Sequence, residues 1–105
     1  MPKTFHPVAK IGDIAPGELR YVEVAGKAIC LANVHGEILA LDNTCTHERA
    51  PLSEGTLHGE VLECPRHGGA FNAFSGEPER YPAVYPVKTY SVRVENGEIL
   101  VGIRT

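Results

Sequence analysis

One stretch of sequence decides how this 105-residue chain is interpreted: Cys45-Thr46-His47, then 16 residues, then Cys64-Pro65-Arg66-His67-Gly68-Gly69-Ala70-Phe71-Asn72. Each half supplies one cysteine and one histidine. Thiolate sulfur and neutral imidazole nitrogen are ligands that suit iron, zinc and copper(I). The spacing therefore predicts a four-ligand metal centre built from two loops.

Two kinds of metal centre fit two cysteines and two histidines. Structural zinc usually takes both thiolates before both imidazoles, whereas the ligands here alternate. Alternation lets the two cysteines bind one iron, and the two histidines the other iron, of a two-iron, two-sulfur cluster. Gly68 and Gly69 lack a Cβ, so backbone N–H groups there can approach inorganic sulfide. The sequence favours the cluster, and a structural zinc module that binds another protein stays open as an alternative.

These motifs resemble the soluble Rieske-type ferredoxins of bacterial aromatic-ring-hydroxylating dioxygenase systems, such as those for biphenyl, naphthalene and carbazole. The resemblance spans nearly the whole chain and rests on CTH and CPxHGGxFN, followed by Ser75-Gly76 and by Pro82-Ala83, where the family has a proline loop over its cluster. It implies one [2Fe-2S] cluster of the Rieske type. It also implies these ligands: Cys45 and Cys64 on the inner iron, His47 and His67 on the outer iron.

The chain departs from respiratory and photosynthetic Rieske proteins at several positions. Those proteins join their ligand loops by a disulfide, but Ala50 and Arg66 stand here where its cysteines would fall. They also donate hydrogen bonds to the cluster from a serine and a tyrosine, where this chain has Gly69 and Phe71. Because such bonds favour the reduced state, we expect a potential near the lower end of the roughly −150 to +300 mV range of these centres.

The remaining sequence predicts strands and no long helix. Apolar runs predict strands at Leu19–Val24, Lys27–Val34 and Glu37–Leu41, and the second is apolar on both faces, as in a central strand. Two alternating runs on either side of Asn96-Gly97 predict a hairpin with a type I′ turn. We expect an all-β, Rieske (ISP-like) fold: an antiparallel β-sandwich or barrel base with an inserted small cluster-binding subdomain. The expected division is a single domain over 1–105, with its base in 1–42 and 81–105 and the cluster subdomain in 43–80.

Charge and composition describe a small carrier. The formal net charge is −3, and the segment from Asn43 to Arg80 holds six acids against three bases, so it carries the whole imbalance. An acidic cluster segment suits docking to basic surfaces of redox partners and argues against nucleic acid, although a merely solvated surface explains it as well. No apolar run is long enough to cross a bilayer, and the start lacks a signal-peptide core, so we expect a cytoplasmic protein without membrane contact. We also expect a monomer.

Other residues receive ordinary structural interpretations. Cys30 lies in an apolar run and is expected to be a small buried residue. His6, His35 and His58 lie outside the motifs and are expected on the surface or in hydrogen bonds. Tyr81 and Tyr85 flank the proline loop and are expected to pack over the base of the cluster subdomain.

The function implied by the resemblance is electron transfer without catalytic turnover. The chain would take electrons from an NAD(P)H-dependent ferredoxin reductase and pass them to a terminal ring-hydroxylating oxygenase. Two alternatives share the fold: a Rieske ferredoxin for another oxygenase, and the small subunit of nitrite reductase. The latter often lacks the ligands, so the presence of all four here weighs against it.

Overall fold

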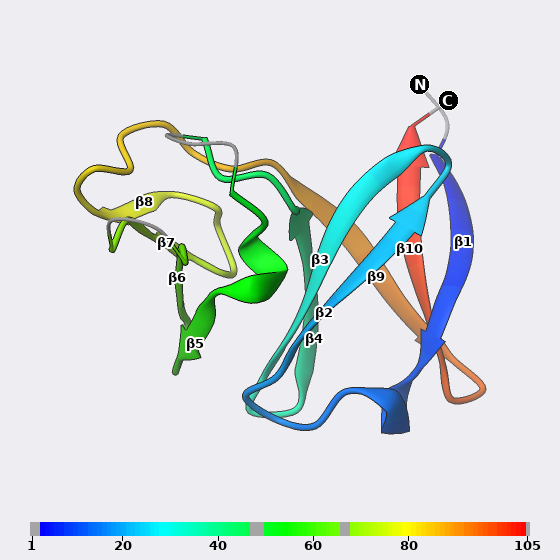
Figure 1. Ribbon diagram of the computed structural model, residues 1–105. Coiled ribbons are helices and arrows are strands. Elements are labelled where there is room, and N and C mark those ends of the chain that lie inside the picture. Colours follow the sequence, from blue (N-terminus) through cyan, green and yellow to red (C-terminus); the bar gives the residue numbers. More distant parts are fainter. Residues whose placement is uncertain (1–2, 47–49, 66–67, 105) are drawn as a thin grey trace.

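The computed structural model describes residues 3–46, 50–65 and 68–104, and the described residues are nearly all β. They form ten strands and two short 3-10 helices in two antiparallel sheets (Figure 1). The elements are β1 (Lys3–Lys10), η1 (Ile11–Asp13), β2 (Leu19–Val24), β3 (Lys27–Val34), β4 (Glu37–Asp42), η2 (Leu52–Glu54), β5 (Thr56–His58), β6 (Val61–Glu63), β7 (Ala70–Asn72), β8 (Pro78–Arg80), β9 (Thr89–Glu95) and β10 (Glu98–Arg104).

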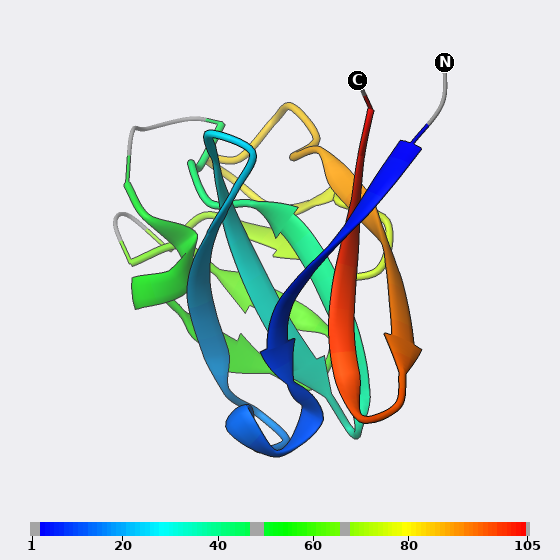
Figure 2. The same ribbon diagram turned by 90° about the vertical axis from the view of Figure 1, so that its right-hand side faces the viewer.

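The larger sheet, which we call the base, has six strands in the order β1-β10-β9-β4-β3-β2. The sheet curls so that its two edge strands, β1 and β2, approach one another (Figure 2). Strands β2 and β3 confirm the predicted ranges, and β4 extends one residue beyond its prediction. The burial of β3 from Ile29 to Val34 confirms that it is a central strand.

The hairpin of β9 and β10 confirms the prediction of a type I′ turn. Asn96 and Gly97 have φ angles of 52° and 79°, the two positive values that this turn requires. Strand β10 also pairs with β1, whose register shifts between Pro7 and Ala9. Proline has no N–H to donate, and a bulge in an edge strand accommodates it. The predicted all-β fold is thus confirmed.

Two apolar cores divide the molecule. One lies inside the base and contains Ile14, Val24, Ile29, Leu31, Ile38, Ala40, Ile99, Val101 and Ile103. The other lies on the opposite face of β3 and β4, where residues between β4 and β9 pack against these strands. It contains Cys30, Ala32, Leu41, Cys45, Ala50, Leu52, Leu62, Cys64, Phe71, Ala83 and Val87. Because adjacent residues of β3 point to opposite faces, this one strand supplies both cores.

The second sheet, β5-β6-β7-β8, belongs to an arm that leaves the base after β4 and returns at β9. The two places where the arm joins the base lie side by side, because β4 pairs with β9 there, at Ala40–Tyr90 and Leu41–Thr89. The amide of Asp42 also donates to the carbonyl of Lys88 at 2.9 Å. The base therefore holds both ends of the arm together (Figure 1).

Candidate metal centre

The two cysteine motifs begin in the same way. The amide of Cys45 donates to the carbonyl of Ala50 at 3.0 Å, and the amide of Cys64 donates to the carbonyl of Gly69 at 2.7 Å. Each bond joins residues five positions apart, so the chain returns to the cysteine after five residues. The two motifs thus share a backbone hydrogen bond from the cysteine amide to the carbonyl five residues later.

Both cysteines are buried, each with 3% of its surface exposed, within the core between the arm and the base. A thiol loses its proton when it binds a metal, and the metal compensates the buried negative charge. Two buried sulfurs on two matching loops fit a cluster iron bound from the protein side. This chemistry suits the [2Fe-2S] centre that the sequence predicts.

The other two predicted ligands, His47 and His67, lie outside the described residues, as does Arg66. Within the described ranges, no group of three or more His, Cys, Asp or Glu side chains is placed to hold a metal ion. The assignment of the four ligands therefore stays a prediction. His58, which we expected on the surface or in a hydrogen bond, is exposed at the end of strand β5 and bonds to Glu63, as described below.

The first ligand loop is anchored by Asn43, a buried polar residue that the sequence analysis did not single out. Its amide donates to the carbonyl of Ala28 at 3.0 Å, and its own carbonyl accepts from Leu52 at 2.6 Å. Its side-chain Oδ1 accepts from the amide of Ser53 at 2.8 Å. Asn43 thus ties the start of the loop to β3 and to η2 beyond the loop.

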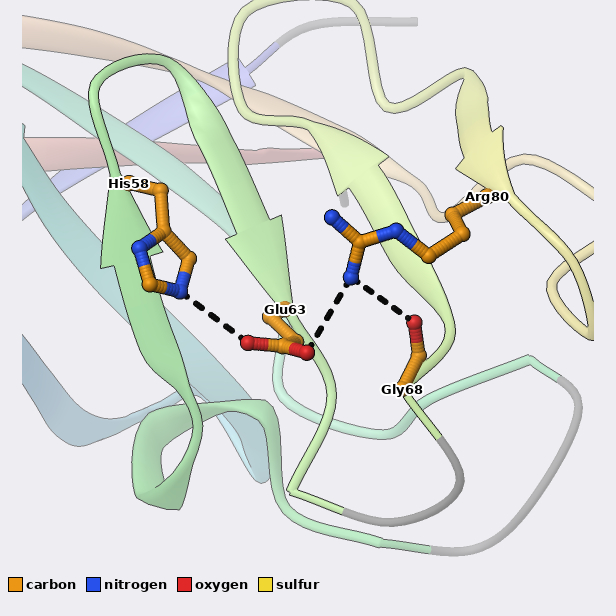
Figure 3. A network of polar contacts seen from close by, with 4 residues as sticks. All are labelled: His58, Glu63, Gly68 and Arg80. Carbon is orange, nitrogen blue, oxygen red and sulfur yellow. Dashed lines mark hydrogen bonds and ion pairs between the residues drawn. The ribbon is translucent and has the colours of Figure 1, made fainter.

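The second ligand loop is held by a polar network on the outside of the arm (Figure 3). Arg80 donates from Nη1 to Glu63 Oε2 at 3.1 Å and to the carbonyl of Gly68 at 3.2 Å. The other carboxylate oxygen of Glu63 lies 3.0 Å from His58 Nε2. No pattern in the sequence indicates these roles of Glu63 and Arg80; the one available signal was their position next to Cys64 and the proline loop.

The proline loop, residues 81–88 between β8 and β9, forms three hydrogen bonds with other described residues of the arm. Thr46 donates its hydroxyl to the carbonyl of Tyr85 at 2.8 Å, and the amide of Ala83 donates to the carbonyl of Arg80 at 3.1 Å. The amide of Val87 donates to the carbonyl of Gly76 at 2.9 Å. The loop therefore lies against both the first ligand loop and the turn between β7 and β8.

Our expectation that Tyr81 and Tyr85 pack over the base of the cluster subdomain is wrong. They are 82% and 69% exposed. Ala83 and Val87, both buried, supply the side chains that this segment packs into the core. The exposed tyrosines instead face solvent on the surface of the proline loop.

Cys30 confirms its interpretation as a buried residue, since none of its surface is exposed. It shares a core with Cys45 and Cys64 but lies on β3, outside either ligand loop. Burial raises the pKa of the Cys30 thiol from 9.0 to about 12. The thiol therefore stays protonated and uncharged at neutral pH, and Cys30 packs in the core as a small apolar residue.

Residues 4–91 match the family model of the Rieske [2Fe-2S] domain. The chain belongs to the Rieske family. Its cofactor is a Rieske-type [2Fe-2S] cluster, which stores one electron at a time, and this decides between the iron-sulfur and zinc alternatives. The Rieske domain accounts for both ligand loops and for most of the base.

Curated Rieske relatives extend over nearly the same length. Ferredoxin CarAc of Metapseudomonas resinovorans is 43% identical over 90% of this chain and 89% of its own length. The ferredoxin component of the naphthalene 1,2-dioxygenase and salicylate 5-hydroxylase systems of Ralstonia sp. is 40% identical over 96% of this chain and 97% of its own. Since these relatives are ferredoxin components, the chain is an electron-transfer protein and not a catalytic oxygenase.

Solved structures agree with this placement. The Sphingomonas yanoikuyae B1 ferredoxin aligns with a TM-score of 0.92 at 32% identity, over 96% of this chain and all of its own. A structure of the complex of reduced oxygenase and oxidized ferredoxin in carbazole 1,9a-dioxygenase matches with a TM-score of 0.88 and 41% identity, covering 92% of this chain and 91% of that chain. In the part of this Rieske protein that the structure describes, no helix has the length and apolar character to span a membrane.

Proposed function

We propose that this Rieske ferredoxin carries single electrons from an NAD(P)H-dependent ferredoxin reductase to the terminal oxygenase of an aromatic-ring dioxygenase system. The observation that carries the proposal is the pair of matching cysteine loops in a chain 41% identical to a ferredoxin solved together with its oxygenase. In this scheme the ferredoxin is a cytoplasmic monomer, and the oxygenase performs the chemistry on the aromatic compound.

The proposed ligands are Cys45 and Cys64 on the inner iron and His47 and His67 on the outer iron. The burial of both cysteines supports the first half of this assignment. The alternation of cysteine and histidine in the sequence supports the second half. His67→Cys tests it: a retained cluster would be held by three cysteines and His47, so its electron-paramagnetic-resonance spectrum should depart from the Rieske type, and an unchanged spectrum would contradict ligation by His67.

The electron-transfer step is tested by mixing reduced ferredoxin with an oxidised oxygenase component from a carbazole or naphthalene dioxygenase system. We expect the ferredoxin to be reoxidised in proportion to the oxygenase added, with product formed when reductase, NAD(P)H and aromatic substrate are present. A ferredoxin that takes up electrons from dithionite but passes none to either oxygenase would overturn the proposed partner. Light scattering of the same sample tests the proposed monomer.

A second candidate partner is an oxygenase that adds a single hydroxyl group. It is favoured by one observation: the Ralstonia relative is named for both a dioxygenase and a salicylate 5-hydroxylase system. The same mixing experiment with a hydroxylase component separates the two candidates. Faster reoxidation by the hydroxylase than by either dioxygenase would favour this alternative.

A further inference from the structure

We infer that Arg80 is a positioning residue for the second ligand loop, acting together with Glu63. This inference rests on the proposed ligand set and adds to it a device that fixes the loop between Cys64 and Gly69. Neither residue is a proposed ligand, and both lie on short strands of the arm, Glu63 at the end of β6 and Arg80 at the end of β8.

The guanidinium of Arg80 connects two points on either side of that loop. Its Nη1 lies 3.1 Å from Glu63 Oε2, directly before Cys64, and 3.2 Å from the carbonyl oxygen of Gly68, at the far side of the loop (Figure 3). The backbone bond from Cys64 to Gly69 closes the loop from the inside, at 2.7 Å. The arginine side chain therefore holds the two ends of this loop from the outside, in addition to that backbone bond.

The backbone of Arg80 also contacts strand β7 and the proline loop. Arg80 pairs with Ala70, the first residue of β7 beyond the ligand loop. Its carbonyl accepts the amide of Ala83 at 3.1 Å. One residue thus contacts the beginning and end of the ligand loop with its side chain and the proline loop with its main chain. A displacement of Arg80 would move all of these together.

Glu63 completes the arrangement by holding the arginine in place. One of its carboxylate oxygens accepts a hydrogen bond from the guanidinium of Arg80. The other lies 3.0 Å from His58 Nε2 on the neighbouring strand β5. The Arg80 and Glu63 side chains are 55% and 30% exposed, and exposed ion pairs contribute little to stability by charge attraction alone. The main effect of the Glu63–Arg80 pair is therefore to orient the arginine side chain toward the carbonyl of Gly68.

Charge and geometry predict different results when the pair is changed. Arg80→Gln removes a positive charge near the cluster loop and leaves the Glu63 carboxylate, so the oxidised state is favoured and the potential falls. Glu63→Gln has the opposite effect on the potential. The double variant R80Q/E63Q restores the charge balance but not the bond between guanidinium and Gly68. A merely coulombic pair would regain wild-type behaviour in the double variant, and a positioning pair would not.

The experiment measures the potential, the electron-paramagnetic-resonance line shape and the rate of iron loss to a chelator in the purified holoprotein. Arg93→Gln is the matched control, because Arg93 also faces a glutamate, Glu95 at 3.9 Å, but on the base. We expect R80Q and R80Q/E63Q to lose iron about tenfold faster than R93Q, the size of effect typical of residues that orient metal ligands. We also expect broadened spectra in both variants and a near-normal potential in the double variant.

Two results would overturn the inference. One is an R80Q protein that matches R93Q in iron loss and line shape, whatever its potential. The other is a double variant that regains every wild-type property, which would make the pair coulombic. If R80Q does not fold, Arg80→Lys provides the test: a single ammonium keeps the charge, so its potential should stay normal while iron loss accelerates, and wild-type iron loss would count against positioning. No partner protein is used, so a failure to reduce an oxygenase leaves these readouts unaffected.

Discussion

Thr46 donates its hydroxyl to the backbone carbonyl of Tyr85 at 2.8 Å, and this bond joins the first ligand loop to the proline loop. Thr46 stands between Cys45 and the predicted ligand His47 in the sequence. Tyr85 lies 39 residues further along, in the proline loop between β8 and β9. The Thr46 hydroxyl thus connects two segments of the arm that lie far apart in the sequence.

Thr46→Val should loosen the proline loop, because valine has nearly the same shape but no hydroxyl donor. A neutral hydrogen bond contributes about 1 kcal/mol, which corresponds to roughly fivefold faster amide exchange where opening of the loop controls it. Hydrogen exchange at the amides of Ala83 and Val87 is the measurement. Thr46→Ser keeps the donor and serves as control, and equal exchange in the two variants would contradict the role of the bond.

Gly76→Ala should destabilise the protein by about 2 kcal/mol or more. Gly76 has a φ of 79°, and a Cβ there would collide with the backbone carbonyl oxygen of Val87. Gly97 has the same φ of 79° but has no neighbour within 4 Å of the added Cβ, so Gly97→Ala measures the cost of the conformation alone. Urea unfolding of both variants should show the larger loss for G76A; equal losses would mean that the collision is relieved without cost.

Phe71→Tyr should raise the reduction potential. Phe71 is fully buried in the core that contains both Cys45 and Cys64, so a hydroxyl added to its ring enters the surroundings of the cluster. A hydrogen bond donated to a cluster or ligand sulfur favours the electron-rich reduced state. A spectroscopic redox titration measures the shift, with the exposed Phe74→Tyr as control. An unchanged or lower potential in F71Y would remove the hydrogen-bond explanation of the low potential expected here.

Alkaline pH should destabilise the fold partly through Cys30. The pKa of its thiol is raised by burial from 9.0 to about 12, so the folded state holds the proton more tightly than the unfolded state. The resulting stability is complete below pH 9 and is lost as the pH rises toward 12. It amounts to up to about 4 kcal/mol, since one pKa unit corresponds to 1.36 kcal/mol.

Cys30→Ala tests this dependence, because alanine cannot ionise. Urea unfolding of C30A should weaken less between pH 9 and pH 12 than that of the wild type, even though its stability at pH 7 is lower from the lost packing. Burial and a hydrogen bond to Asp42 raise the pKa of Tyr90 as well, so some alkaline loss should remain in C30A. Parallel pH profiles of the two proteins would exclude Cys30 as a contributor.

The sequence predicts best those parts of the fold that local patterns specify. Strand β3 follows from its apolar run, and the turn at Asn96-Gly97 from the need for two positive φ angles. The spacing of the cysteine motifs predicts two ligand loops, but it does not predict the contacts that hold these loops in place. Asn43 and Arg80 bond to groups whose positions depend on how the arm folds onto the base, and no short-range pattern reports that.

The tyrosines of the proline loop illustrate a different limit. Aromatic residues beside prolines suggested packing, yet the small Ala83 occupies the inward position and both rings face outward. Which side chains of an irregular loop are buried depends on how the loop packs on the rest of the protein, and the sequence alone does not specify that packing. The predicted histidine ligands, His47 and His67, lie outside the described residues, so their placement stays a prediction.

The separation of the two cores bears on how the protein matures in the cell. Within the part of the chain that the structure describes, the core inside the base takes no side chain from residues 43–88. The strands that flank the arm pair with each other at Ala40–Tyr90 and Leu41–Thr89, so the base brings the two ends of the arm together by itself. We therefore expect a newly made chain to fold its base before iron and sulfide arrive, leaving an assembly-competent apoprotein whose arm orders last, around the incoming cluster.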